Sequence, residues 1–156
     1  MERIFEDYFS EIQADMVDIC MEYVDDRADE VYIYCCYEDG MLTSDHFYNI
    51  DGKIVMKHKL NDISTNNIEY DVSTERQGMV LSILNNDIEQ IKELCLEYKR
   101  EIPTEIKLIY NVKENSLKAE YKYENVWSDD PKKLPQHVAK EWFEEIKLEN
   151  ENKNKK

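Results

Sequence analysis

Histidine, cysteine and glycine are the residue types that most often build catalytic, metal-binding or phosphate-binding sites. Their spacing in this chain supports no such site. The three histidines are scattered over the chain, at His46, His58 and His137. They form no H-E-x-x-H motif and no Cys/His cluster with metal-ligand spacing, so we expect each to lie alone at the surface. The three glycines lie too far apart to build a phosphate-cradling loop. We therefore predict a protein that is not an enzyme and that needs no metal or other cofactor.

The four cysteines, at positions 20, 35, 36 and 95, include no C-x-x-C pair. Cys35 and Cys36 are adjacent, so on a strand their side chains would point to opposite faces. A nucleophilic thiol needs a base, and His46 on a neighbouring strand could face one of them, an alternative that the sequence leaves open. We interpret the cysteines as reduced, mostly buried thiols, as in a cytoplasmic protein.

No apolar run approaches the ~20 residues of a membrane span, and the acidic start is unlike a signal peptide.

Carboxylates are so abundant that a chance pair able to do acid–base work has no specificity. The chain has 35 Asp and Glu against 20 Lys and Arg, for a formal net charge of −15. The pairs at positions 25–26 and 129–130 lack the pattern of a calcium-binding loop, so helix capping and solvation are their expected roles. An acidic chain repels nucleic acid and anionic membranes and attracts basic partners. Solubility alone is the alternative explanation of this charge.

The negative charge is concentrated at the start of the chain, where residues 1–30 hold eleven acids and two bases, a net charge of −9. Apolar residues at spacings of three and four predict a helix over residues 2–24, with an inward stripe that includes Phe5, Phe9, Ile12 and Met16. Acids recur at the same spacing on another face, at Asp7, Glu11, Asp15, Asp18 and Glu22. We predict that these five acids belong to a partner-binding surface. A merely solvated helix face is the alternative.

Period-two alternation predicts a β-hairpin over residues 105–123, with residues 113–116 as its polar connection. Tyr121 and Tyr123 share one face of its second strand, as core residues or as interface anchors. Residues 31–37, 41–50 and 53–59 form a predicted meander with Asp-Gly turns at 39–40 and 51–52. A loop over 60–73 then precedes a helix that begins with a Thr74/Gln77 capping box and ends near Lys99.

A last helix follows Pro135 and carries Val138, Trp142 and Ile146 on one face. The element order α-β-β-β-α-β-β-α predicts an α+β fold, with a single antiparallel sheet of about five strands and helices packed on it. We expect residues 1–148 to form one α+β domain. Residues 149–156 have no apolar side chain and are expected to form a disordered polar tail.

The chain resembles the YezG-type immunity proteins in four segments. These are the acidic first helix, the strand and turn VYIYCCYEDG, the segment PTEIKLIYNVKENSLKAEYKYENV and the later EWFEEIK. The resemblance covers about residues 2–147. It rests on the order of the secondary-structure elements and on the residue pattern of the hairpin. It implies an α+β antitoxin in the cytoplasm that binds the C-terminal domain of a cognate polymorphic toxin, commonly a secreted nuclease, and occludes its basic catalytic domain. Independently of the resemblance, the acidic charge and the lack of a long apolar run predict no direct binding of nucleic acid or of a membrane. A structural or adaptor module without a toxin partner is the alternative function.

Overall fold

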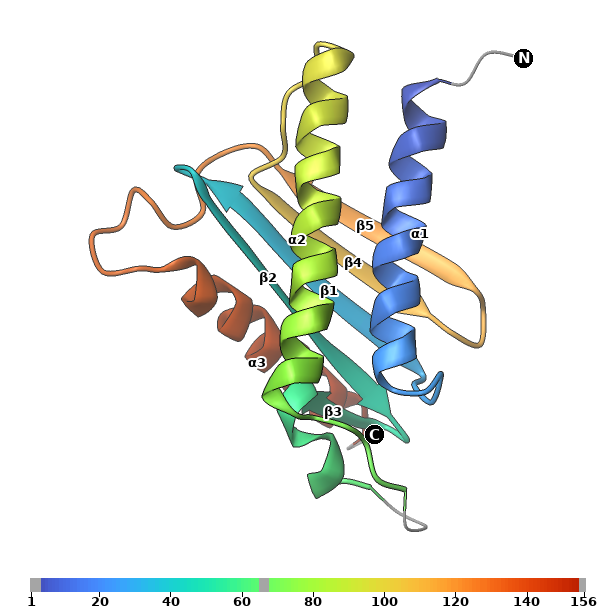
Figure 1. Cartoon of the computed structure of the whole chain (residues 1–156). Coiled ribbons are helices and arrows are strands. Elements are labelled where there is room, and N and C mark those ends of the chain that lie inside the picture. Colours follow the sequence, from blue (N-terminus) through green and yellow to red (C-terminus); the bar gives the residue numbers. More distant parts are fainter. Residues whose placement is uncertain (1–3, 65–67, 155–156) are drawn as a thin grey trace.

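The computed structural model describes residues 4–64 and 68–154 and is built on one antiparallel sheet (Figure 1). The strands are β1 (Glu30–Glu38), β2 (Met41–Ile50), β3 (Lys53–Met56), β4 (Glu105–Asn111) and β5 (Ser116–Lys122). The helices are α1 (Phe5–Tyr23), α2 (Thr74–Glu97) and α3 (Pro135–Asn154), with a 3₁₀ helix, η1 (Lys57–Asp62), after β3. The sheet order is β3-β2-β1-β4-β5, and every neighbouring pair is antiparallel. The predicted α+β fold with a single five-stranded sheet is confirmed.

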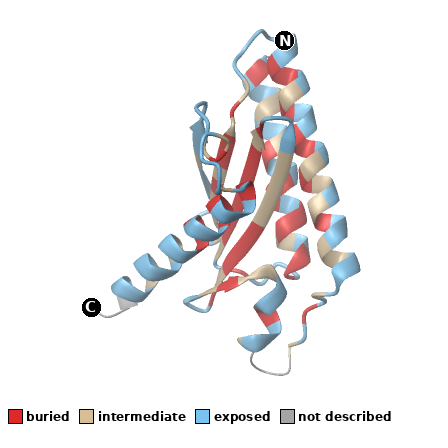
Figure 2. Ribbon diagram, turned by 90° about the vertical axis from the view of Figure 1, so that its left-hand side faces the viewer, coloured by how far each residue is buried: buried red, intermediate tan, exposed pale blue. Residues whose placement is uncertain are grey.

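The central strand, β1, is buried on both faces because helices cover both sides of the sheet (Figure 2). Ile33 and Cys35 pack toward α1 and α2, whereas Tyr34 and Cys36 pack toward α3. A strand buried on both faces reads as a continuous apolar run, which is why this segment is so rich in aliphatic and aromatic residues. The predicted opposite orientation of the two adjacent cysteines is confirmed. All four cysteines are free and buried.

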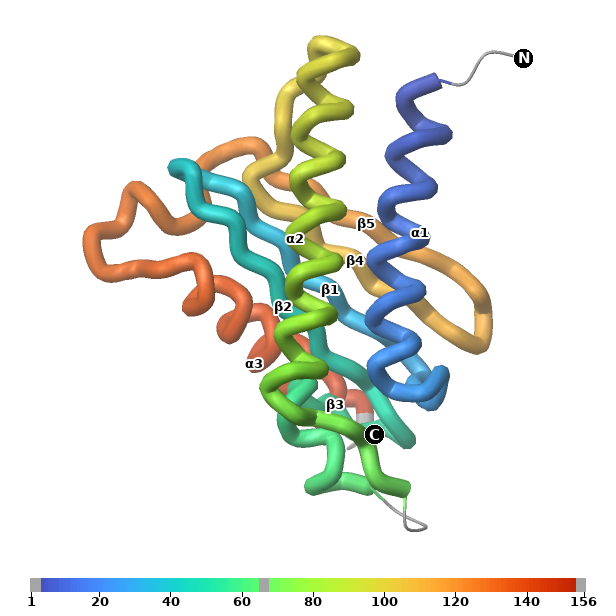
Figure 3. The backbone as a smooth tube through the Cα atoms, viewed as in Figure 1, coloured from blue at the N-terminus to red at the C-terminus, as the bar shows by residue number. Residues whose placement is uncertain are grey.

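Helices α1 and α2 run antiparallel, side by side, over one face of the sheet (Figure 3). Met16 of α1 is fully buried there, and burial of such a side chain contributes about 1.5–3 kcal/mol. Phe5 is buried as predicted, but Phe9 and Ile12 are only half-buried. The inward stripe of α1 is therefore narrower than the sequence pattern indicates, and its margins remain accessible.

Helix α3 packs on the opposite face of the sheet, against β2 and β3. Its predicted inward residues Val138 and Trp142 are buried, and Ile146 is half-buried. The Trp142 ring lies 5.1 Å from the Phe47 ring, edge to face, and 5.9 Å from the Tyr32 ring. This aromatic cluster forms a second core, separate from the one beneath α1 and α2.

Both predicted Asp-Gly turns connect neighbouring strands. Asp39 and Gly40 have φ values of 53° and 72°, and Asp51 and Gly52 have φ values of 52° and 82°. Two consecutive residues with positive φ are the requirement of a type I′ hairpin turn, whose twist matches that of the flanking strands. These turns fix the register of the meander.

Several predicted boundaries are wrong. Strand β3 ends at Met56 instead of residue 59, and η1 occupies residues 57–62 because Leu60 is buried there as an anchor. The N-cap of α2 is Ser73, one residue before the predicted Thr74, since the Ser73 hydroxyl accepts a hydrogen bond from the Arg76 N–H at 3.2 Å. Helix α3 continues through the expected polar tail as far as Asn154. The predicted helical residues 2–3, loop residues 65–67 and tail residues 155–156 lie outside the described residues.

Candidate partner-binding surface

The predicted acidic surface is an exposed face of α1. We call it the acidic face; its members are Asp7, Glu11, Asp15, Asp18 and Glu22, and all five are exposed. At 3.6 residues per turn they share one side of the helix, away from the buried Met16. The structure thus places these carboxylates together on the outer layer of the molecule.

Two members of the acidic face also take part in the fold. The Asp7 carboxylate accepts a hydrogen bond from the Ile4 N–H at 3.2 Å, which satisfies one of the orphan donors at the start of α1. Asp15 reaches the carboxyl group of Asp87 on α2. Asp18 and Glu22 are therefore better probes of the surface charge than Asp7 or Asp15.

Asp87 is a buried carboxyl group that the sequence analysis missed. Its side chain is only 3% exposed, and burial, followed by a hydrogen bond with Asp15 and the charge of Asp15, raises the pKa of Asp87 to about 8. Burial and the neighbouring Asp15 carboxylate thus favour the protonated form of Asp87, whose hydroxyl can donate a hydrogen bond to Asp15. Its position, three residues after Leu84 and four before Ile91 on the inward side of α2, was the available signal.

The acidic surface continues from α1 onto α2. A groove of about 270 Å³ lies between the two helices. Glu11, Glu93 and Glu97 line this groove together with apolar side chains such as Ile12 and Leu94. Helical spacing indicates this surface on α1 alone, because nothing in a linear sequence shows which turn of α2 lies beside Glu11.

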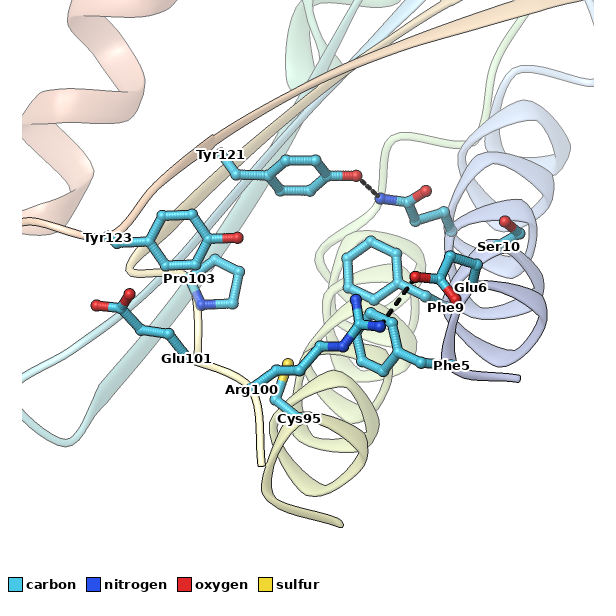
Figure 4. A pocket seen from close by; sticks show the side chains of 11 residues that line it. Phe5, Glu6, Phe9, Ser10, Cys95, Arg100, Glu101, Pro103, Tyr121 and Tyr123 are labelled. Carbon is cyan, nitrogen blue, oxygen red and sulfur yellow. Dashed lines mark hydrogen bonds and ion pairs between the residues drawn. The ribbon is translucent and has the colours of Figure 1, made fainter. Parts of the chain in front are cut away.

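A larger cavity of about 530 Å³ lies between the start of α1, the end of α2 and β5 (Figure 4). We call it the aromatic cleft; it is lined by Phe5, Glu6, Phe9, Ser10, Gln13, Cys95, Arg100, Glu101, Pro103, Tyr121 and Tyr123. The side chains of Tyr121 and Tyr123 are 36% and 46% exposed, so these two tyrosines are not core residues. Residues more than a hundred positions apart in the sequence meet here, so no local sequence pattern indicates the cleft.

Arg100 lies inside the aromatic cleft, with its guanidinium group 4.0 Å from the centroid of the Phe5 ring. Its Nη2 atom pairs with Glu6 Oε1 at 3.0 Å. The backbone holds it there, because the Arg100 N–H donates to the Cys95 carbonyl at 2.8 Å and Lys99 adopts a left-handed φ of 56°. This is a Schellman-type helix end with lysine at a position that favours glycine. On the other wall, Gln13 donates a hydrogen bond to the Tyr121 hydroxyl.

His46 is not the surface residue that the sequence predicts, since it is 1% exposed beneath α1. The Tyr48 hydroxyl donates to the Cys20 carbonyl at 2.7 Å, so its oxygen accepts from His46 Nδ1 at 2.7 Å. Burial and the neighbouring Lys57 lower the pKa of His46, which keeps the imidazole neutral. Burial likewise raises the pKa of the Cys20 and Cys35 thiols. The arrangement is a buried polar network and does not activate a thiol.

The described residues contain no group of three His, Cys, Asp or Glu side chains placed to hold a metal ion. Over residues 4–64 and 68–154, no helix has the length and apolar character needed to cross a membrane. A scan of the sequence against models of protein families gives no match, and a search among curated proteins also finds none. The resemblance to the YezG-type immunity proteins therefore remains a hypothesis.

Proposed function

We propose that this protein is an immunity protein, which binds a cognate polymorphic toxin and covers its basic catalytic domain. The observation that carries the proposal is the acidic face of α1, which continues across the groove onto Glu93 and Glu97 of α2. A nuclease domain must carry basic residues to hold phosphate groups, so a secreted nuclease is the toxin class that fits this surface best.

Electrostatics favours binding to a basic domain in two ways. Complementary charges steer the two proteins together and raise the association rate at low ionic strength. Repulsion between like charges on one helix face, which costs roughly 0.2–0.5 kcal/mol per pair, is relieved when a basic surface lies against it. The excess charge of α1 therefore has a physical use in a complex, beyond solubility.

The surroundings of the acidic face also match the anatomy of a protein–protein interface. Such interfaces combine aromatic anchors with a polar or charged rim. Here Phe9, Tyr121 and Tyr123 line the aromatic cleft at the margin of the helix that carries the acids. The free, buried cysteines are compatible with action in the cytoplasm of the producing cell, where a toxin must be neutralised before export.

Affinity isolation from the native host tests the proposal. Tagged wild-type protein should retain a stoichiometric amount of a basic toxin domain, and the isolated complex should lack the toxin activity that the separated domain shows. A variant with Asp18→Lys and Glu22→Lys should retain much less. A stable assembly that contains no toxin would overturn the proposal in favour of the structural or adaptor module.

A further inference from the structure

The outer edge of β5 and the neighbouring side of α1 form an open seam. β5 is the last strand of the sheet, and nearly all of its residues are exposed. Two cavities lie along the seam: the aromatic cleft, and a smaller one of about 290 Å³ that includes Asp18 and Leu117. Ser10 and Gln13 line both cavities, so the two lie next to each other between α1 and β5.

The backbone N–H and C=O groups at the open edge of β5 belong to residues whose side chains face α1. The Lys122 carbonyl accepts a hydrogen bond from the Thr104 N–H at 2.8 Å, so Lys122 directs its backbone toward β4. Backbone direction alternates along a strand together with side-chain direction. The backbone groups of Leu117, Ala119 and Tyr121 therefore face the open edge, while their side chains face α1.

The aromatic cleft already holds a guanidinium group, that of Arg100. The Arg100 guanidinium stacks on the Phe5 ring and pairs with Glu6, a combination of cation–π attraction and charge-assisted hydrogen bonding. The cleft contains a further aromatic ring and a second carboxylate, those of Tyr123 and Glu101. In Figure 4, Tyr123 and Glu101 lie on the wall opposite Phe5 and Glu6, with open space between the two walls.

We infer that an extended segment of a basic partner pairs with the open edge of β5 and places an arginine side chain in the aromatic cleft, against Tyr123 and Glu101. The strand would supply backbone hydrogen bonds, and the cleft would supply the preference for arginine, as in other cases of strand addition. The inference rests on the proposed function only for the identity of the partner, which would be the toxin.

The charges around β5 are consistent with a cationic guest on this side of the sheet. Lysine on an edge strand commonly protects against strand addition. Lys118 and Lys122 alternate with Tyr121 and therefore project to the face that carries α3. Lys122 lies 3.9 Å from Glu105, which belongs to that face through its bond to Tyr34. The lysines thus lie on the opposite face from the aromatic cleft. Among the described residues that line this cleft, the two acids Glu6 and Glu101 outnumber the one cation, Arg100.

The direct test is an NMR titration of ¹⁵N-labelled full-length protein with a short β-forming peptide, acetyl-Val-Thr-Val-Arg-Val-Thr-amide. The matched peptide carries citrulline, which has the shape of arginine without its charge, in place of the arginine. We expect the arginine peptide to shift the amide signals of residues 117–123 and of Arg100, and to bind at least about fivefold more tightly than the citrulline peptide. Equal binding of both peptides, shifts elsewhere on the protein, or no shifts at millimolar peptide would overturn the inference.

Two variants assign the effect to the cleft. Glu101→Gln and Tyr123→Ala alter exposed side chains and should each weaken binding of the arginine peptide about three- to tenfold. Glu144→Gln makes the same charge change as Glu101→Gln but on α3, across the sheet, and should leave the affinity unchanged. If Glu144→Gln weakens binding as much as Glu101→Gln, the peptide recognises net charge and not the cleft. The peptide test needs no toxin, so a negative result would leave the proposed function standing. Equally, the peptide could bind as expected even if no toxin partner is found.

Discussion

Two sets of carboxylates, taken from opposite sides of the sheet, act in opposite ways. On the side of α3, Glu38 and Glu105 are buried and turned inward, where they bond to groups of the protein. On the side of α1 and α2, Asp18 and Glu22 are exposed and turned outward. The comparison shows that the large net charge is not one property of the whole chain. One set of acids holds the fold together, and the other is available to a partner.

Glu38 shows how an inward acid works. Its carboxylate accepts hydrogen bonds from the backbone N–H groups of Val126 and Ser128, both at 2.6 Å, and of Trp127 at 3.2 Å. Burial alone would raise the pKa of Glu38, but hydrogen bonds from the Ser128 hydroxyl and from these backbone groups hold the pKa below its usual value. Glu38 thereby fixes the segment between β5 and α3 and seats Trp127 in the second core.

The largest expected effect is the loss of this inward acid. Glu38→Ala leaves three backbone donors without their acceptor, and each unsatisfied buried donor costs about 1–3 kcal/mol. Because water can reach part of the segment, we expect the free energy of unfolding to fall by on the order of 3 kcal/mol. Urea denaturation measures it. Glu22→Ala is the outward control and should change stability by less than about 0.5 kcal/mol. Similar losses in both variants would erase the distinction between the two sides.

A pH-dependent effect is expected from Asp87, a buried acid that faces the exposed Asp15. Its folded pKa of about 8 exceeds its ordinary value of 3.8, so the stability that it contributes is full below about pH 4 and is lost as the pH rises toward 8. Asp87→Asn keeps a donor for Asp15 but cannot ionise. The variant should gain stability relative to the wild type across this window, by at most about 1.4 kcal/mol per pH unit, and the gain should level off above pH 8.

Thermal or urea denaturation at a series of pH values checks this expectation. The acid limb should be shared by both proteins, because the lowered pKa of His46 makes stability fall below about pH 6.5 in each. A stability difference between Asp87→Asn and wild type that does not change between pH 5 and pH 8 would contradict the assignment of a protonated Asp87.

The features that sequence could predict are those set by local pattern. Period-two alternation identified the strands, Asp51-Gly52 gave a type I′ turn, and the adjacent Cys35 and Cys36 fell on opposite faces. The acidic face of α1 was visible because it depends only on helical spacing. Local patterns fix which side of an element a residue occupies.

The missed features depend on contacts between distant parts of the chain. Asp87 meets Asp15 across two helices, and the aromatic cleft joins Phe9 of α1 to Tyr121 of β5. His46 was misassigned because its burial depends on α1, whose Tyr23 ring lies 5.1 Å from the imidazole, and a polar residue type does not indicate such packing. Such juxtapositions follow from topology and packing, and single-sequence periodicity carries no signal for them.

The smallest expected effect on stability is that of reversing the outward acids. Asp18→Lys combined with Glu22→Lys relieves like-charge repulsion on α1, so the free energy of unfolding should stay the same or rise by a few tenths of a kcal/mol. The matched pair Glu144→Lys and Glu151→Lys makes the same change in net charge on α3. Circular dichroism during thermal unfolding compares the two. A large loss of stability in the α1 pair would mean that these acids support the fold.

The most direct measurement of the central claim is the association rate between this protein and the toxin domain isolated from its host. With Asp18→Lys and Glu22→Lys, the rate constant at low ionic strength should fall about tenfold or more, because complementary charges act mainly on the encounter. The difference from wild type should shrink as salt shortens the screening length toward ~8 Å. The Glu144→Lys and Glu151→Lys pair should associate at close to the wild-type rate. Equal slowing by both pairs, or no slowing by either, would contradict the claim that the acidic face of α1 is the surface that meets the partner.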